Sequence, residues 1–275
     1  MYIYNNTMAL DANKNLSITQ AGITKNLEKL SSGLRINRAA DDAAGLAISE
    51  KMRAQLKGME RAELNAQDAI SLIQTAEGAL DTINGILVRL EDLSTEAATN
   101  SLNNTDRAKI NAEYSALKAQ INQMADNVNF NSIKLLSGGF SGAANTKVFQ
   151  VGALAAEKMT IAINRAAFSA IVTGGTLSLT TVTGANAAIT KVQNAIEKLA
   201  TRRAQLGAYQ NRLEHTITNL GNMNQNLTVA ESRIRDLDMA KEMTEYSRNQ
   251  ILQQTGMAML AQANQIPSQI LSLMR

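Results

Sequence analysis

A run of 26 residues without a charged side chain, Asn249 to Met274, constrains this chain more than any other stretch. It is rich in Leu, Met, Ala and Gln, which are strong helix formers, so residues 248–265 are predicted to be helical. A membrane span needs roughly 18 or more mostly apolar residues, and amide side chains interrupt this run at short intervals. An ordinary surface helix would keep a charged face in water. The run therefore predicts a helix buried among other helices, completed by neighbouring copies of the chain.

The other end of the chain carries a coiled-coil seam in which residues recur at alternating steps of four and three. Its members are Ala9, Asn13, Leu16, Gln20, Ile23, Leu27, Leu30 and Leu34. Since both ends are long helices with few charges, we expect the two termini to pair with each other and copies to pair side by side. The self-assembly seam that we predict consists of Leu16, Ile23, Leu27, Leu30, Leu34, Met257, Leu260 and Leu271.

Between the termini the apolar pattern predicts further long helices. The first helix should span residues 3–33 and a second should run from Ala43 to Thr99, with Asp41 or Asp42 as its N-cap. Gly58 lies inside the second helix, where glycine is unfavourable, so we expect a kink, a break or a close contact with another helix there.

A turn at residues 100–105 precedes a third helix, which Thr105 or Asp106 should cap and residues 127–131 should end. Residues 185–237 keep a seven-residue apolar repeat and predict one long helix, antiparallel to the second.

Residues 138–184 differ in character, because Gly, Thr, Ser and Val increase while charged residues become rare. Val148–Val151 and Met159–Ile163 alternate as strands do and predict an irregular hairpin. Thr176–Thr183 is β-prone but short.

These segments predict a mainly α fold, a long antiparallel helical rod or coiled-coil bundle with paired terminal helices and a small β-hairpin region. We expect residues 1–40 and 238–275 to form the terminal helix pair. Residues 41–237 should form the helical rod domain, with the β-hairpin and loop insertion at about 138–184.

The residue types needed for most enzyme chemistry are absent or isolated. There is no cysteine, and His215 is the only histidine, which argues against a zinc site. The pair Asp41–Asp42 is explained by capping and the helix dipole. The glycine pairs lack a phosphate-binding context, and a net charge of +3 without a basic block argues against nucleic-acid binding. We therefore expect no enzyme, no cofactor, no metal and no membrane span.

Two long segments resemble a known family. Residues 251–275, ILQQTGMAMLAQANQIPSQILSLMR, resemble the C-terminus of bacterial flagellins, and residues 27–55 resemble their N-terminal signature. Residues 129–138 and 233–254 extend the resemblance, which covers nearly the whole chain apart from about 140–184.

The resemblance implies a structural subunit that polymerises into the extracellular flagellar filament for motility. Implied partners are other copies, the flagellar export apparatus with its chaperone, and the filament cap and hook-junction proteins. The first residues, MYIYNNTMALDANK, lack the features of a secretory signal peptide, so we expect export without a cleaved signal. The alternatives are a hook–filament junction protein of the flagellum and a non-polymerising coiled-coil binding module.

The resemblance also implies a surface for a flagellin-sensing Toll-like receptor. Residues 87–93, LVRLEDL, are similar to the family's receptor-binding helical segment, with Arg89, Asp92 and Leu93 at matching positions and Glu91 reversing a charge. Arginine is enriched among binding hot spots, so Arg89 is the predicted anchor. The competing interpretation is that this stretch is only a helix surface used in filament contacts.

Overall fold

The computed structural model describes residues 6–138, 146–172 and 178–273, with side chains described up to Ile266 at the C-terminal end. The chain forms two compact units, residues 1–55 with 225–275 and residues 56–224. Helices α2 (Ala43–Ala97) and α5 (Val182–Arg235) contribute residues to both units. The predicted class, mainly α with long antiparallel helices and a small β region, is confirmed.

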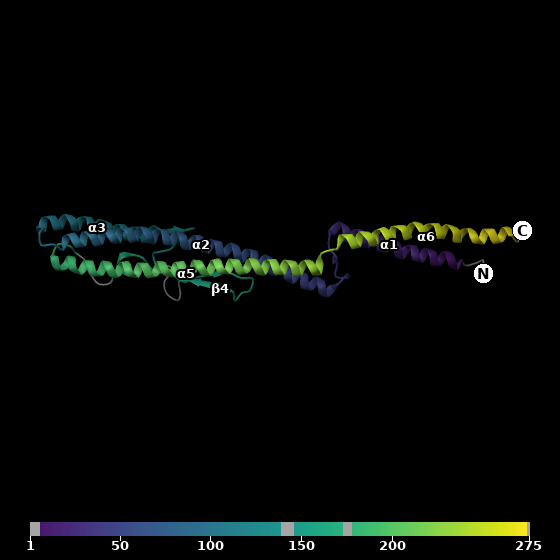
Figure 1. The fold of residues 1–275 in the computed structure, drawn as a ribbon, viewed down its shortest axis with the longest axis horizontal. Coiled ribbons are helices and arrows are strands. Elements are labelled where there is room, and N and C mark those ends of the chain that lie inside the picture. Colours follow the sequence, from purple (N-terminus) through teal and green to yellow (C-terminus); the bar gives the residue numbers. More distant parts are fainter. Residues whose placement is uncertain (1–5, 139–145, 173–177, 274–275) are drawn as a thin grey trace. The chain divides into compact units, whose positions relative to one another are not determined.

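The first unit is built on α1 (Thr7–Ser32) and α6 (Met239–Leu273), which run side by side (Figure 1). The Asn6 side chain caps α1 by accepting a hydrogen bond from the backbone N–H of Ala9. Gly33 ends α1 in the left-handed conformation, at φ 70°, which glycine adopts without steric cost. The Asp238 carboxylate accepts from two backbone N–H groups in the first turn of α6.

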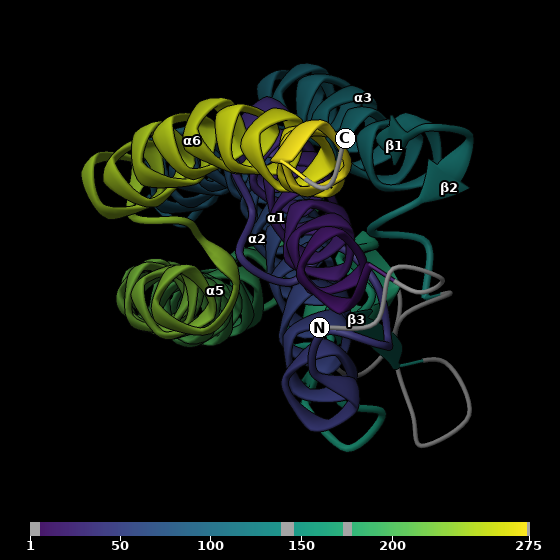
Figure 2. The same ribbon diagram turned by 90° about the vertical axis from the view of Figure 1, so that its right-hand side faces the viewer.

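In the second unit, α2 and α5 run antiparallel beside α3 (Asn104–Asn127), and Figure 2 shows these helices nearly end-on. Gln193 donates to Glu91 at 2.8 Å. Ten residues earlier along α2, Asp81 pairs with Arg203 at 2.9 Å. Later residues of α2 thus meet earlier residues of α5.

The core of the second unit follows heptad spacing on both of its long helices. The buried positions of α2 at this spacing include Ala66, Ala69, Ile73, Ala76, Leu80, Ile83, Leu87 and Leu90. Those of α5 are Ala185, Ala188, Val192, Ala195, Leu199, Leu206 and Leu213. Alternate small and large side chains on facing helices allow close interdigitation.

Helix α3 adds one cationic and one aromatic side chain to this core. Arg107 is 7% exposed and donates to the carbonyls of Ala97, the last residue of α2, and of Thr99, two residues beyond it. Tyr114 is fully buried, and its hydroxyl has no hydrogen-bond partner. Arg107 therefore donates to carbonyls that have no partner within the helix. The buried Tyr114 hydroxyl, by contrast, loses its hydrogen bonds to water and gains none in the fold.

Two short hairpins and a single helical turn complete the second unit. Strands β1 (Asn129–Phe130) and β2 (Ile133–Lys134) are joined by Asn131 and Ser132, both with positive φ, as in a type I′ turn. Strands β3 (Lys147–Gln150) and β4 (Lys158–Ile161) pair antiparallel. The short helix α4 (Phe168–Ile171) packs its aromatic ring into the core.

Several predicted details need correction. Helix α2 is continuous through Gly58, and no other helix approaches it there. The neighbour is a loop instead, since an added Cβ would stand 3.0 Å from Cβ of Ala153. Asn103, rather than Thr105 or Asp106, caps α3, because its side chain accepts from the N–H of Asp106. The hairpin β1–β2 was not expected.

Two further details concern the long helices. Helix α5 begins at Val182, so the β-prone segment 176–183 ends in a helix, while residues 176–177 lie outside the described part. Of the two predicted caps for α2, Asp42 is correct, since its carboxylate accepts from Gly45 N–H at 2.9 Å.

Candidate assembly surface

The α1–α6 pair is held antiparallel by a buried polar cluster, here called the Asn26 cluster, which consists of Asn26, Glu242, Asn249 and the Tyr246 backbone. Asn26 and Glu242 are each only 6% exposed. In its satisfied orientation the Asn26 amide donates to Glu242 and accepts from Asn249 and from the N–H of Tyr246, at 3.1–3.2 Å. Lys29 places its ammonium 3.6 Å from the Glu242 carboxylate. A buried polar residue in a helix seam fixes register, and this cluster fixes one pairing of α1 with α6.

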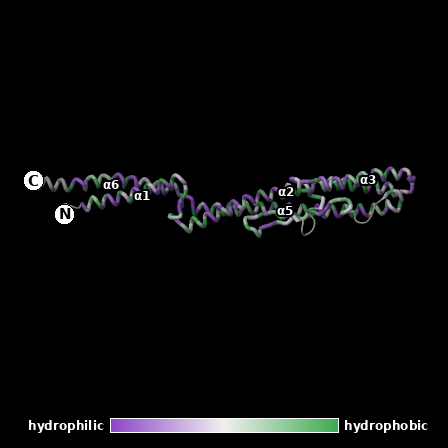
Figure 3. The backbone as a smooth tube through the Cα atoms, turned by 180° about the vertical axis from the view of Figure 1, so that it is seen from behind, coloured by the Kyte–Doolittle hydropathy of each residue, from purple (hydrophilic) through white to green (hydrophobic). Residues whose placement is uncertain are grey.

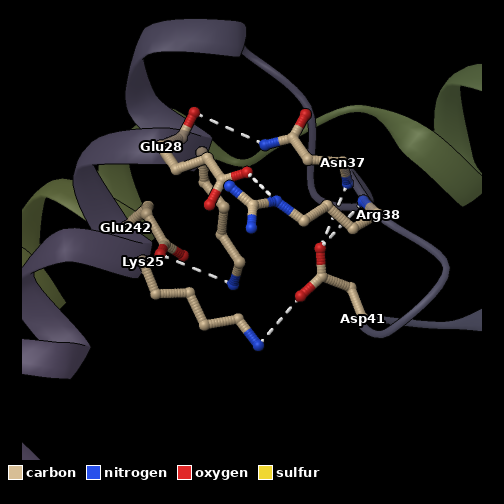
Figure 4. A network of polar contacts seen from close by, with 7 residues as sticks. Lys25, Glu28, Asn37, Arg38, Asp41 and Glu242 are labelled. Carbon is tan, nitrogen blue, oxygen red and sulfur yellow. Dashed lines mark hydrogen bonds and ion pairs between the residues drawn. The ribbon is translucent and has the colours of Figure 1, made fainter.

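A second polar network connects α1 to the connector before α2 (Figure 4). Lys25 pairs with Asp41 at 2.9 Å, and Asp41 also accepts from the backbone N–H groups of Arg38 and Asn37. The Lys25 hydrogen bond and these backbone donors lower the pKa of Asp41 to about 2. Arg38 in turn donates to Glu28 at 2.7 Å. The connector is thus fastened to the last turns of α1 by charge-assisted hydrogen bonds.

Away from these contacts, both helices expose large apolar side chains to solvent. The exposed set, between 45% and 65% accessible, is Met8, Leu10, Ile18, Leu27, Met239, Met243, Ile251, Leu252, Met257 and Met259. Residues 249–266 of α6 carry no charge that could keep this surface hydrated. Exposed apolar surface of this extent marks an interaction site.

A groove of about 400 Å³ lies between α1 and α6 on this pair. Its walls are Ala12, Asn15, Leu16, Thr19, Leu252, Thr255, Gly256 and Met259. All eight residues are uncharged, so the groove suits an uncharged occupant.

Some residues of the predicted seam pack between α1 and α6, and others are exposed to solvent. Ile23 is buried, Leu16 lies against Gly256, and Leu30 and Leu260 are half-buried. Leu34 forms a β-bridge with Asp236 beyond the end of α1.

Leu27 and Met257 are about half exposed. Leu271 lies in α6 beyond the residues whose side chains are described. The seam therefore contains residues that pair α1 with α6 and residues left free for other contacts; its role in assembly stays a prediction.

Sequence reasoning did not single out Asn26, Glu242 or Gly256. The predicted seam stepped from Ile23 to Leu27 and so passed over Asn26, which is buried three residues after Ile23, while Leu27 is exposed. The partners of Asn26 on α6 are more than 200 residues away in the sequence, and only the fold brings them together.

The candidate receptor segment lies on α2 in the second unit. Arg89 is 52% exposed and donates to the Glu113 carboxylate of α3 through two nitrogens, at 2.8 and 3.0 Å. This hydrogen bond raises the pKa of Arg89. Asp92 is exposed, whereas Leu93 is 1% exposed and packs in the core. Arg89 and Asp92 are thus the members of the predicted set that can meet a partner directly.

The part of the chain with described side chains offers no cation site, since no three acidic, histidine or cysteine residues gather there. His215 is exposed on α5. None of the described helices has a stretch apolar and long enough to cross a bilayer. Figure 3 shows hydrophilic and hydrophobic residues interspersed along α6.

Comparison with known proteins matches most of the chain to one protein family. Residues 3–141 match the bacterial flagellin N-terminal helical region, and residues 189–274 match the bacterial flagellin C-terminal helical region. The chain is 47% identical to a flagellin of Halalkalibacterium halodurans over 276 residues, covering all of both chains. It is 45% identical to a flagellin of Bacillus subtilis, again covering all of both.

A solved structure agrees with these sequence matches. The crystal structure of Bacillus cereus flagellin is similar with a TM-score of 0.51 and 33% identity, over 57% of this chain and 88% of that one.

Proposed function

This chain belongs to the bacterial flagellin family and is a structural subunit of the extracellular flagellar filament, and we propose that copies join through the α1–α6 pair. The observation that supports this surface is the row of exposed apolar side chains on two helices with an uncharged end. A monomeric protein would gain nothing from keeping this surface in water.

The energetics favour many contacts over one. Fully burying a Leu, Ile or Met side chain stabilises by about 1.5–3 kcal/mol, so completing the burial of a half-exposed one gives about 1 kcal/mol. The ten exposed side chains together offer about 10 kcal/mol. Association itself costs about 4–15 kcal/mol. A single pairwise contact is therefore weak, and a stable polymer requires that each copy contact several neighbours.

The two alternatives are not favoured. A hook–filament junction protein and a non-polymerising coiled-coil module both fit the helical fold, but the relatives matched over their whole length are flagellins. The family is structural rather than enzymatic.

Further partners follow from membership of the family as proposals. We propose that the chain is delivered by the flagellar export apparatus with a chaperone, without a cleaved signal, and meets the cap and hook-junction proteins in the filament. We also propose that the monomer is sensed weakly by a Toll-like receptor through Arg89. The half-exposed guanidinium of Arg89 supports this role, and its engagement with Glu113 is a reason to expect weak binding.

Two changes test the assembly surface by seeded growth, followed by light scattering and electron microscopy. Removing residues 249–275 should abolish growth while the second unit stays helical, because its core uses none of these residues. Ile251→Glu, at a position 63% exposed, should also stop growth, since it places an unpaired charge in a buried contact.

The matched control is Leu154→Glu, which alters a side chain 57% exposed in the second unit. It should leave growth unchanged. Filaments of normal length from the truncated chain, or equal inhibition by the two glutamates, would show that the α1–α6 surface is not the assembly surface.

A further inference from the structure

The excess positive charge of this chain lies in residues 134–203, although no run of the sequence there is basic. This stretch holds eight basic and two acidic residues, whereas acidic residues outnumber basic ones in the rest of the chain. It includes β3, β4, α4 and the first part of α5, all in the second unit. The fold therefore decides which of these charges lie together.

Two cations of α5 hold the segment that contains α4. Arg202 Nη1 donates to the carbonyl of Arg165 at 2.7 Å, and Lys198 Nζ donates to the carbonyl of Ile171 at 3.3 Å. Since Lys198 and Arg202 are four residues apart, they lie on the same face of α5. Both ends of the segment thus have a basic side chain of α5 beside them.

Two more cations lie at the same segment. Lys118 of α3 places its ammonium 5.3 Å from the centre of the Phe168 ring. Arg165 belongs to the segment itself, and its side chain is exposed. These four residues form what we call the α4 basic patch, which consists of Lys118, Arg165, Lys198 and Arg202.

The patch lacks carboxylates that would neutralise it. Among the described residues, no carboxylate pairs with Lys118, Arg165 or Arg202, whereas the neighbouring Arg203 pairs with Asp81 at 2.9 Å. Arg202 is partly buried, and this burial lowers the pKa of its guanidinium. A guanidinium that loses water without gaining a carboxylate is stabilised when an anion reaches it from outside the chain.

A small hollow beside Arg202 can receive part of such an anion. Its volume is about 10 Å³, close to what one water molecule needs. Its polar side chains are Arg202, Asn164 and Gln205, and all three carry N–H donors. The hollow therefore suits one oxygen atom of a carboxylate or sulfate group.

The spread of the charges favours a polymer over a small ion. Lys198 and Arg202 are about 6 Å apart along α5, and Lys118 lies on another helix. A small ion would reach only part of the patch, whereas a chain with many anionic groups gains from several contacts at once. Single-stranded nucleic acid would also need exposed aromatic rings for its bases, and Phe168 is only 3% exposed.

We propose that the α4 basic patch binds acidic polysaccharides, whose carboxylate or sulfate groups contact Lys118, Arg165 and Arg202. A filament outside the cell is the setting in which such polymers are met. The activity goes beyond assembly, because the patch lies in the second unit and uses no residue of the α1–α6 pair.

The first test measures binding of fluorescently labelled heparin, a sulfated polymer, and polygalacturonate, a carboxylated one, to the full-length monomer by fluorescence anisotropy. Arg165→Glu should weaken binding about tenfold, and this side chain has no hydrogen bond to lose. The matched control is Lys57→Glu, at a side chain 80% exposed in the same unit, and should stay within about twofold of wild type. Salt at about 1 M should abolish binding, because it screens charges beyond about 3 Å.

The second test separates charge from structure at Arg202. Arg202→Gln should weaken binding about fivefold, whereas Arg202→Lys keeps the charge and should stay within about twofold of wild type. Circular dichroism of both variants should match wild type. Equal weakening by the two substitutions would show that Arg202 only supports the fold and would overturn its contact with the polymer.

The remaining outcomes are equally distinct. Binding of either acidic polymer supports the proposal, and their ratio tells whether sulfate or carboxylate is preferred. Equal loss in Arg165→Glu and Lys57→Glu, or neutral dextran bound as tightly as heparin, would overturn the patch as the site. Tighter binding of single-stranded DNA would overturn the polysaccharide as its occupant. A raised critical concentration for polymerisation of Arg165→Glu, with unchanged heparin binding, would assign the patch to contacts between copies and overturn the proposal.

Discussion

Replacing Tyr114 by phenylalanine should stabilise the second unit. The Tyr114 hydroxyl is fully buried in the core and has no hydrogen-bond partner. A buried donor left unpaired costs about 1–3 kcal/mol, and the oxygen contributes little packing that a ring of the same shape would lose. We therefore expect Tyr114→Phe to raise the free energy of unfolding at pH 7 by about 1 kcal/mol.

Alkaline pH should enlarge the difference. Burial raises the pKa of Tyr114 from the ordinary value of 10.0 to about 12. Because the folded state keeps the proton to higher pH than the unfolded state, stability is fully present below about pH 10 and falls as pH rises to about 12. Each pKa unit is worth about 1.4 kcal/mol, so the wild type should lose about 2–3 kcal/mol more than Tyr114→Phe across this window.

Urea denaturation of the monomer, followed by circular dichroism at pH 7 and at intervals from pH 9 to 12, measures both effects. With an m value of about 2 kcal/mol/M, the pH 7 midpoint should rise by about 0.5 M. Tyr209→Phe, at a half-buried tyrosine, controls for the general effect of removing a hydroxyl and should stay within about 0.5 kcal/mol of wild type. A midpoint lowered by Tyr114→Phe, or the same alkaline slope in both chains, would refute the reasoning.

Three further predictions concern single charged groups. The folded-state pKa of Asp41 is lowered, so the contribution of Asp41 to stability is present above about pH 4 and is lost as pH falls to about 2. Lys25→Met should raise the pKa of the Asp41 carboxyl towards 3.8, measured by NMR titration. An unchanged pKa in this variant would contradict Lys25 as the cause. Arg107→Ala should lower the free energy of unfolding by about 2–3 kcal/mol in urea denaturation, because the Ala97 and Thr99 carbonyls lose their donor; a loss below 0.5 kcal/mol would exclude this capping role. In a receptor reporter assay, the monomer should activate weakly, filaments should not activate, and Arg89→Ala should remove most of the signal, whereas equal potency of Arg89→Ala would exclude the site.

The long helices could be predicted because their apolar repeat is a local property of the sequence. The seven-residue spacing through Val192, Leu199, Leu206 and Leu213 led to the correct helix and to the correct buried face. The antiparallel pairing followed, since two such faces must bury each other.

The caps and hairpins were harder, because several residues in a row satisfy the same local rule. Residues 103–106 are Asn, Asn, Thr and Asp, all good N-caps, and only the packing of α3 selects Asn103. Strands of two residues, as in β1 and β2, are too short for alternation to be visible. Val182 and Thr183 favour strands, yet they begin α5 because the core continues from Ala185.

The sequence predicted an assembly surface on the terminal helices as a whole, and this surface stays a proposal. The uncharged run pointed to α6 as a whole. Which of its residues face α1 depends on the register, and the Asn26 cluster sets that register through partners distant in the sequence.

The Asn26 cluster also fixes how far α6 extends past α1 in every subunit. A slip of α6 by one turn, about 5.4 Å, would part Asn26 from Glu242, Asn249 and Tyr246 and leave its amide with only the Gly22 carbonyl of its own helix. Every copy therefore presents the same length of α6 beyond Asn249. Because a helical polymer repeats one contact between identical copies, a fixed length in each copy gives uniform spacing along the polymer.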